Sequence, residues 1–162
     1  MQKIQNLIKA LFRTIVATFV LCGILLMSAN SYQTILGVNA YSLISQKKWE
    51  IDSLMVGDYE IIVPNSVENA YLNFSGGSVS GIPGCNNFFA NFSIAGGGKM
   101  IIIEGGGLTR KLCDSIEGSQ IEAIFIKNFI GKFMVQGNEE YIELVGESGF
   151  SIRLLPSITL EP

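Results

Sequence analysis

Residues 80–92 read SGIPGCNNFFANF and residues 108–113 read LTRKLC, and these two stretches decide how the chain folds. Each holds one of the two cysteines that lie outside an apolar leader, Cys85 and Cys113. Glycine and asparagine around Cys85 are typical of a tight corner, because both residues tolerate turn conformations. We therefore interpret the two stretches as a structural tie between a corner of a sheet and a distant segment.

The first 31 residues are expected to be a signal peptide or an N-terminal membrane anchor. Residues 14–29 read TIVATFVLCGILLMSA without a charge and follow three basic residues, which is the layout of a secretory signal. This run is short against the roughly 17–25 residues that span a bilayer, so cleavage is favoured over anchoring. Leu21 before Cys22 gives no lipidation signal. We expect export to the periplasm or cell envelope, with inner-membrane anchoring by residues 14–29 if the leader is retained.

Composition excludes several classes of function. Beyond residue 13 the chain has eight basic and fourteen acidic residues, a net charge of −6, which offers no basic surface for nucleic acid. The chain has no histidine, so Ser-His-Asp and Cys-His catalysis and histidine-based metal sites are excluded. Two cysteines alone are too few for a structural zinc. We expect no catalytic residue, no metal and no cofactor.

Loss of the leader would leave Cys85 and Cys113 as the remaining cysteines. In an oxidising compartment such a pair persists as a disulfide. It would close a loop of about 27 residues and stabilise the fold by about 3–4 kcal/mol in the chain-entropy model. Two buried thiols that pack as small hydrophobes are the alternative.

Short apolar stretches separated by turn residues predict strands. Residues 70–74 alternate between polar and apolar, and residues 100–103, MIII, form a run typical of a strand buried on both faces. Glycine clusters follow at 76–77, 96–98 and 105–107. None continues into the Gly-Lys-Ser/Thr of a phosphate loop, so we interpret all three as turns at strand ends.

One helix is predicted over residues 114–129. Its apolar stripe has helical spacing and comprises Ile121, Ile124, Phe125 and Phe129. Three charged residues are expected off this stripe: Glu117, Glu122 and Lys127. Asp114 or Ser115 can cap the helix, and Gly131 can end it.

These elements predict a mainly β (α+β) fold. We expect a strongly curved antiparallel sheet or partial barrel of seven to eight short strands, with one helix inserted before the last three and covering one end. Residues 32–48 are expected to be a linker, residues 49–156 the domain and residues 157–162 a tail. The expected core anchors are Trp49, Phe74, Phe88 and Phe125.

Four polar residues near the cysteines are candidates for a binding rim: Asn86, Asn87, Thr109 and Arg110. In one interpretation the asparagine side chains satisfy backbone groups of the corner. In the other, all four converge on one rim of the sheet and contact a partner. The sequence favours the structural role for the two asparagines and leaves the binding role open.

The order of these features resembles the META domain, the family of the bacterial heat-shock envelope protein HslJ. The resemblance extends from Trp49 to about Leu155 and is carried by Trp49, LNF at 72–74, SGIPGCNNF at 80–88, TRKLC at 109–113, and Glu122. It implies a small, usually exported β-rich domain, often lipid-anchored and tied to heat stress and novobiocin tolerance, with no established activity or ligand. The absent lipidation signal and Leu112 before the second cysteine depart from the family pattern.

Two hypotheses of function follow. The first is a non-enzymatic exported domain that supports the cell envelope under stress by binding an envelope protein or a small amphipathic molecule. The alternative is an inhibitor or chaperone-like module whose rigid corner, residues 84–88, inserts into an exported enzyme or a misfolded client. In both cases we expect a monomer that contacts a membrane only through an uncleaved leader.

Overall fold

The computed structural model describes residues 39–45, 47–67 and 70–157 of the 162-residue chain. The predicted signal peptide or anchor, residues 1–31, lies outside the described residues, as does the predicted tail beyond Ser157. Within the described ranges, no helix combines the length and the apolar character needed to cross a membrane.

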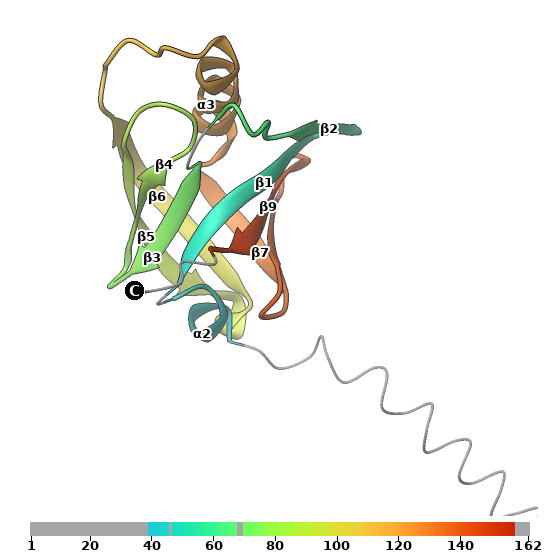
Figure 1. Cartoon of the computed structure of the whole chain (residues 1–162). Coiled ribbons are helices and arrows are strands. Elements are labelled where there is room, and N and C mark those ends of the chain that lie inside the picture. Colours follow the sequence, from blue (N-terminus) through green and yellow to red (C-terminus); the bar gives the residue numbers. More distant parts are fainter. Residues whose placement is uncertain (1–38, 46, 68–69, 158–162) are drawn as a thin grey trace, which may run out of the picture. The chain divides into compact units, whose positions relative to one another are not determined.

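The described part of the chain forms an antiparallel β-barrel (Figure 1). Its strands are β1 (Lys48–Val56), β2 (Tyr59–Ile62), β3 (Tyr71–Ser75), β4 (Ser78–Ile82), β5 (Phe88–Ala95), β6 (Met100–Leu108), β7 (Gly131–Gly137), β8 (Ile142–Gly146) and β9 (Phe150–Pro156). Because β1 pairs with both β3 and β9, eight strands close the barrel, and β2 is an extra strand on the second half of β1. The predicted curved antiparallel sheet is confirmed, and the partial barrel is in fact closed.

Side-chain alternation places the core inside the barrel. On β3, Leu72 and Phe74 are buried whereas Asn73 is exposed. On β5, Phe88 faces the core while its neighbour Phe89 faces solvent. Successive strand residues point to opposite faces, so each strand contributes every second residue to the interior. The four expected core anchors, Trp49, Phe74, Phe88 and Phe125, are each exposed by 2% or less.

The third glycine cluster is not a turn, and that prediction is wrong. β6 continues through Gly105, Gly106 and Gly107 to Leu108 because β5 pairs with Glu104 on one side of Gly105 and Gly106 and with Gly107 and Leu108 on the other. A register shift opposite residues 89–91 of β5 marks a bulge in this part of the ladder. The run at residues 100–103 is also not buried on both faces, since Ile101 and Ile103 are buried and Ile102 is only half-buried. The other two clusters form turns, the second of them η1 (Gly96–Gly98).

The helix predicted before the last three strands is α3 (Ile116–Asn128), which lies over one end of the barrel (Figure 1). Ser115 caps it, because its hydroxyl oxygen accepts a hydrogen bond from the N–H of Gly118 at 3.0 Å. Gly131 does not end the helix, since Phe129 is the C-cap and Gly131 begins β7. Glu122, expected on the solvent side, is buried.

Aromatic side chains attach α3 to the barrel. Phe125 and Phe129 stack at 4.2 Å between ring centroids, and both contact Phe88 of β5 edge to face. Phe129 also packs against Phe133 of β7. Such pairs contribute about 0.5–1.5 kcal/mol each beyond the burial of their area, so the helix is firmly docked at this end.

The predicted linker at residues 32–48 is wrong for its described part. Residues Ala40–Ile44 form α2, at the opposite end of the barrel from α3 (Figure 1). Ala40 and Ile44 are buried, and the indole N–H of Trp49 donates to the backbone oxygen of Ile44 at 2.9 Å. The apolar face of this short helix therefore belongs to the core, which periodicity over so few residues does not reveal.

Candidate functional site

A cavity of about 630 Å³ lies between α3 and the last residues of β6. The backbone of residues 105–110 forms one side of it. Apolar side chains of Phe88, Ile126 and Ile130 form much of the rest, with Asn86 and Glu122 at the polar end. We call this cavity the α3 pocket.

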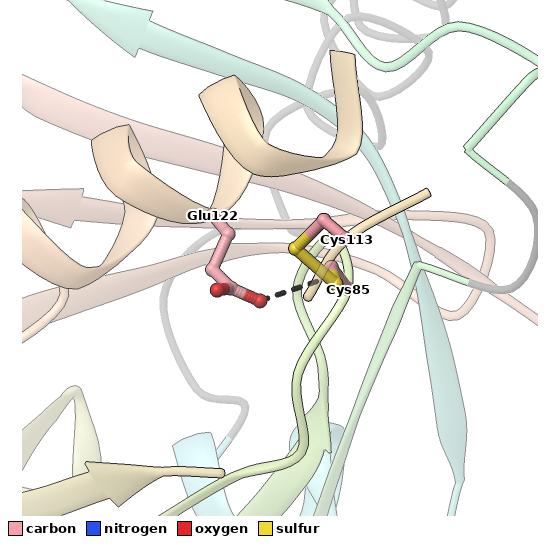
Figure 2. A group of neighbouring side chains, drawn as sticks. All are labelled: Cys85, Cys113 and Glu122. Atoms are coloured by element: carbon pink, nitrogen blue, oxygen red, sulfur yellow. Dashed lines mark hydrogen bonds between the residues drawn. A yellow bond between two sulfur atoms is a disulfide. The ribbon is translucent and has the colours of Figure 1, made fainter. Parts of the chain in front are cut away.

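A disulfide ties the polar end of the α3 pocket. The structure joins Cys85 and Cys113, whose Cα atoms are 5.7 Å apart, and this is the pairing that the sequence favoured over two free thiols. Cys85 belongs to the corner between β4 and β5, and Cys113 to the segment that leads into α3. The carboxylate of Glu122 lies beside the disulfide (Figure 2).

Glu122 holds the corner to the helix through three hydrogen bonds. One carboxylate oxygen, Oε2, accepts from the backbone N–H groups of Cys85 and Asn86. The other, Oε1, accepts from the side-chain amide of Asn86 at 3.0 Å. A buried carboxylate without hydrogen-bond donors would strongly destabilise the fold. Glu122 can be buried because it accepts these hydrogen bonds.

Asn86 bonds to both segments of the tie at once. Its oxygen Oδ1 accepts from the hydroxyl of Thr109 at 2.8 Å and from the N–H of Lys111 at 2.9 Å. Its Nδ2 donates to Glu122 and, at 3.4 Å, to the backbone oxygen of Lys111. Every polar atom of this buried side chain is therefore engaged within the protein. This is a structural role, but the partners lie on the segment before α3 and on α3, and not in the backbone of the corner as the sequence led us to expect.

Gly84 lets the corner approach α3 closely. A Cβ atom at this position would lie 2.2 Å from the backbone oxygen of Gly118, the residue at the first turn of α3. No heavy atoms approach so closely without overlap, so the corner tolerates only glycine here. Asn86 and Glu122 line the α3 pocket, and Gly84 and the disulfide hold them in place from outside its lining. We call these residues together the tied wall.

Of the four residues predicted for a binding rim, the structure brings three to the pocket: Asn86, Thr109 and Arg110. Asn87 is exposed outside its lining, and its backbone N–H donates to the hydroxyl of Thr109 at 3.0 Å. Arg110 is the charged residue of the set. It is exposed, and within the described ranges it forms no ion pair.

Sequence reasoning missed the opposite side of the pocket, which we call the glycine wall: Gly105, Gly106 and Gly107 of β6. The cluster itself was visible in the sequence, but its residues were assigned to a turn. It also missed Ile126 and Ile130, since both are exposed residues that lie off the buried stripe of α3. Ile126 is an exposed residue of α3 and Ile130 follows its C-cap, Phe129, so helical spacing does not relate the two and no sequence signal points to them.

The polar groups at the tied wall do not form a catalytic or metal centre as the structure has them. Ligand atoms of Cys85, Cys113 and Glu122 lie within 4.8 Å of one another, the one such group found in the described ranges. The two sulfurs are bonded to each other, so neither is a thiolate, the form of cysteine that binds metals or acts as a nucleophile. One carboxylate remains, and its hydrogen bonds hold the corner.

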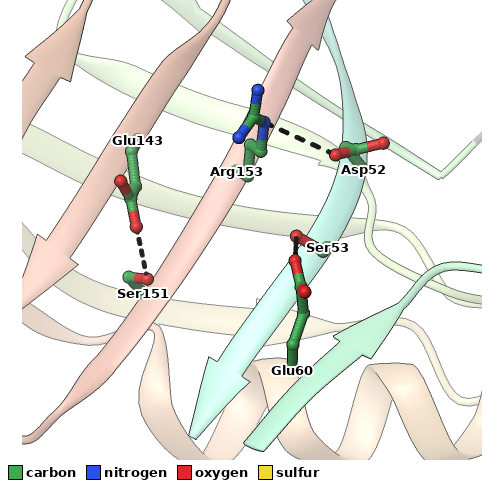
Figure 3. A network of polar contacts seen from close by, with 6 residues as sticks. All are labelled: Asp52, Ser53, Glu60, Glu143, Ser151 and Arg153. Carbon is green, nitrogen blue, oxygen red and sulfur yellow. Dashed lines mark hydrogen bonds and ion pairs between the residues drawn. The ribbon is translucent and has the colours of Figure 1, made fainter. Parts of the chain in front are cut away.

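A second polar group lies away from the pocket, on strands β1, β2, β8 and β9 (Figure 3). The hydroxyl of Ser53 donates to Glu60 at 3.0 Å, and the hydroxyl of Ser151 donates to Glu143 at 2.8 Å. Beside them Arg153 pairs with Asp52 at 3.6 Å across β1 and β9. Pairs of this kind between neighbouring strands stabilise a sheet modestly, and neither serine has a histidine or lysine that would activate it as a nucleophile.

Comparisons with known proteins agree on the fold. A family model described as "META domain" matches residues 42–156. A solved structure titled "NMR structure of the protein from Burkholderia xenovorans" is similar with a TM-score of 0.60 and 22% identity, covering 74% of this chain and 88% of that one. Another, titled "NMR structure of the protein", has a TM-score of 0.53 and 15% identity and covers 74% and 96%. No curated protein sequence matches the chain.

Proposed function

Because this chain belongs to the META domain family, which is not a known enzyme family, we propose that it is a non-catalytic binding module. In this proposal the α3 pocket holds the apolar part of a protein segment or of a small amphipathic molecule. The observation that carries the proposal is the pocket itself: apolar walls with one exposed cation, Arg110, at the rim.

The size and lining of the pocket support a binding role. Sites for small molecules have about 300–1,000 Å³, are mostly apolar and carry a few polar groups that orient the ligand. The α3 pocket, at about 630 Å³, falls within this range. Its tied wall is fixed by a covalent bond and by hydrogen bonds, so a ligand would meet a preformed surface and lose little affinity to ordering the protein.

We propose further that the protein works in the periplasm or at the cell envelope and supports it under stress. The apolar leader at residues 14–29 supports export. A disulfide between Cys85 and Cys113 agrees with an oxidising compartment, where such bonds persist. Heat stress and novobiocin tolerance enter this proposal through the family resemblance alone.

The alternative of an inhibitor or chaperone-like module that inserts its corner finds no support in the geometry. Asn86 and Phe88 are buried, and Gly84 packs against the first turn of α3. Insertion of residues 84–88 into another protein would first require α3 to leave the barrel. Binding at the pocket needs no such change.

A thermal-shift experiment on the disulfide-bonded protein tests the proposed function. The panel contains novobiocin, fatty acids, lysophospholipids and short apolar peptides. At least one compound is expected to raise Tm, and the shift should be lost in Ile130→Glu, which places a charge in the pocket wall. The matched control is Ile62→Glu, an exposed isoleucine on β2, which should respond like the wild type.

Two results would contradict the proposed function. The first is a flat response across the whole panel, and the second is a shift that is identical in Ile130→Glu and in the wild type. Deletion of the gene provides the cellular counterpart, with reduced survival expected under heat or novobiocin. Unchanged survival under both stresses would contradict the envelope part of the proposal.

A further inference from the structure

We propose that the α3 pocket takes an extended peptide segment, which lies along a free edge of β6 and adds a strand to the barrel. The inference rests on the proposed function, since it names the class of ligand for the same pocket. Its basis is a difference between the two edges of β6.

One edge of β6 has no neighbouring strand along its second half. β5 pairs with β6 as far as Leu108, whereas β7 pairs only with residues 100–103. In the described part of the chain, residues 104–108 therefore have no strand on the side of β7. The bulge at Gly105 and Gly106 interrupts the regular alternation here, so the outward backbone groups that lack ladder partners are unevenly spaced along this edge.

Leu108 shows which way the open groups point. The N–H of Thr109 donates to the backbone oxygen of Asn87 at 3.0 Å, toward β5. Backbone groups of neighbouring strand residues point to opposite edges, so the N–H and C=O of Leu108 point away from β5. Leu108 also lines the α3 pocket.

The glycine wall leaves space for another backbone. A Cβ atom at Gly105 would meet no heavy atom within 4 Å. A Cβ at Gly106 would meet Ile130 and Phe88 at 3.3 Å, and one at Gly107 would meet the ring of Phe89 at 2.6 Å. The space for an added strand, at the usual spacing of about 4.7–4.9 Å, is therefore at Gly105. A peptide backbone is the ligand that satisfies a row of donors and acceptors at this spacing, which a small amphipathic molecule does not.

The rest of the pocket selects among peptides. Ile126 and Ile130, which also line the pocket, are 36% and 50% exposed, and they would contact alternate apolar side chains of the added strand. Arg110 lies at one end of the open edge, and Glu104 is exposed at the other. A peptide whose carboxylate end meets Arg110 complements both charges and runs parallel to β6.

The experiment titrates the full disulfide-bonded protein with a synthetic hexapeptide of alternating valine and threonine that ends in a free glutamate. Two further versions are N-methylated, one at the valines and one at the threonines. An added strand bonds through one of its edges only, so one methylated version should bind like the parent. The other should bind at least about tenfold more weakly, because each lost backbone hydrogen bond costs roughly 0.5–1.5 kcal/mol.

Variants locate the site. Ile130→Glu should weaken the parent peptide about tenfold or more, because the pocket gains an unpaired charge. Ile62→Glu, on β2, another strand with an open edge, should leave the affinity unchanged. Amidation of the peptide's C-terminus should weaken binding to the wild type by a few fold, in keeping with an exposed ion pair, and should have no effect on Arg110→Ala. Amide exchange at Leu108 should slow when the peptide binds.

Three results would overturn the inference. The first is equal affinity for the parent and both methylated peptides, and the second is an equal loss of affinity in both methylated versions. The third is binding that Ile62→Glu abolishes and Ile130→Glu does not change. Its failure is separable from that of the proposed function. If a small amphipathic molecule raises Tm through the pocket while no peptide binds, strand addition is wrong and the binding module stands. If nothing binds at the pocket, both are wrong.

Discussion

The two walls of the α3 pocket are built in opposite ways. The tied wall joins a corner to a helix through a disulfide, a buried carboxylate with three donors, and an asparagine whose polar atoms are all engaged. The glycine wall has no side chains, and beyond Ile103 its outer edge has no strand partner in the described part of the chain. One part of the pocket is thus held by covalent and hydrogen bonds, and another part has backbone groups without ladder partners. A preformed site needs both.

Removal of the disulfide from the tied wall is expected to have the largest effect on the free energy of unfolding. The double variant Cys85→Ala with Cys113→Ala should lower the free energy of unfolding by about 3–4 kcal/mol, because it frees a long loop in the unfolded state. Urea unfolding, monitored through the fluorescence of Trp49, measures it. A loss below about 1 kcal/mol, the size of a typical point substitution, would show that the tied wall does not depend on its covalent bond.

One substitution placed on each wall compares them directly. Gly84→Ala should cost about 3 kcal/mol, since its Cβ would overlap the backbone oxygen of Gly118 and displace α3. Gly105→Ala, with φ +66° and open space around its Cβ, should cost only about 1 kcal/mol of backbone strain. Equal costs in urea unfolding would contradict the difference between the walls.

Glu122→Gln tests the carboxylate of the tied wall. Glutamine turns one acceptor oxygen into an N–H₂ donor that faces the donors of Cys85 and Asn86. The free energy of unfolding should therefore fall by about 2 kcal/mol. The control is Glu117→Gln on the same helix, exposed and remote from the corner. An equally small change in both variants would remove Glu122 from the account of the wall.

The smallest expected effect concerns Glu117 and pH. Its own backbone N–H and then the Ser115 hydroxyl lower the pKa of the Glu117 carboxyl from its ordinary value of 4.5. A depressed pKa in the folded state stabilises the protein above the unfolded pKa, and this contribution is lost as pH falls through the folded value. The stability difference between the wild type and Glu117→Gln should thus shrink as pH falls below 4.5. A difference that is constant with pH would contradict this assignment.

The sequence predicts the elements of this fold better than the contacts between them. Alternation on β3 and the stripe of Ile121 and Phe125 are local patterns, and the structure follows them. Several local interpretations are wrong, and two of them show why. The triple glycine is a strand because its partner, β5, lies elsewhere in the sequence, and residues 40–44 form a helix too short to show a period.

The site was harder to predict because its key contacts join distant residues. Glu122 bonds to residues 36 and 37 positions earlier in the chain, so its period on the helix placed it in solvent while the fold buries it. The disulfide was accessible from the sequence because cysteines outside the leader were so few. Asn86, Thr109 and Arg110 were also found, through their proximity to those cysteines. Ile126 and Ile130 became meaningful only when β6 lay opposite them.

The central claim is that the tied wall is rigid and that the edge of β6 at Leu108 is open. Amide hydrogen exchange of the disulfide-bonded protein, measured at Asn86 and at Leu108, tests this claim most directly. We predict that Asn86 is among the slowest amides of the domain and Leu108 among the fastest of any strand. Reduction of the disulfide should raise the exchange rate of the Asn86 amide toward that of Leu108. Similar protection at the two residues in the oxidised protein, or an Asn86 amide that reduction leaves unchanged, would contradict the account.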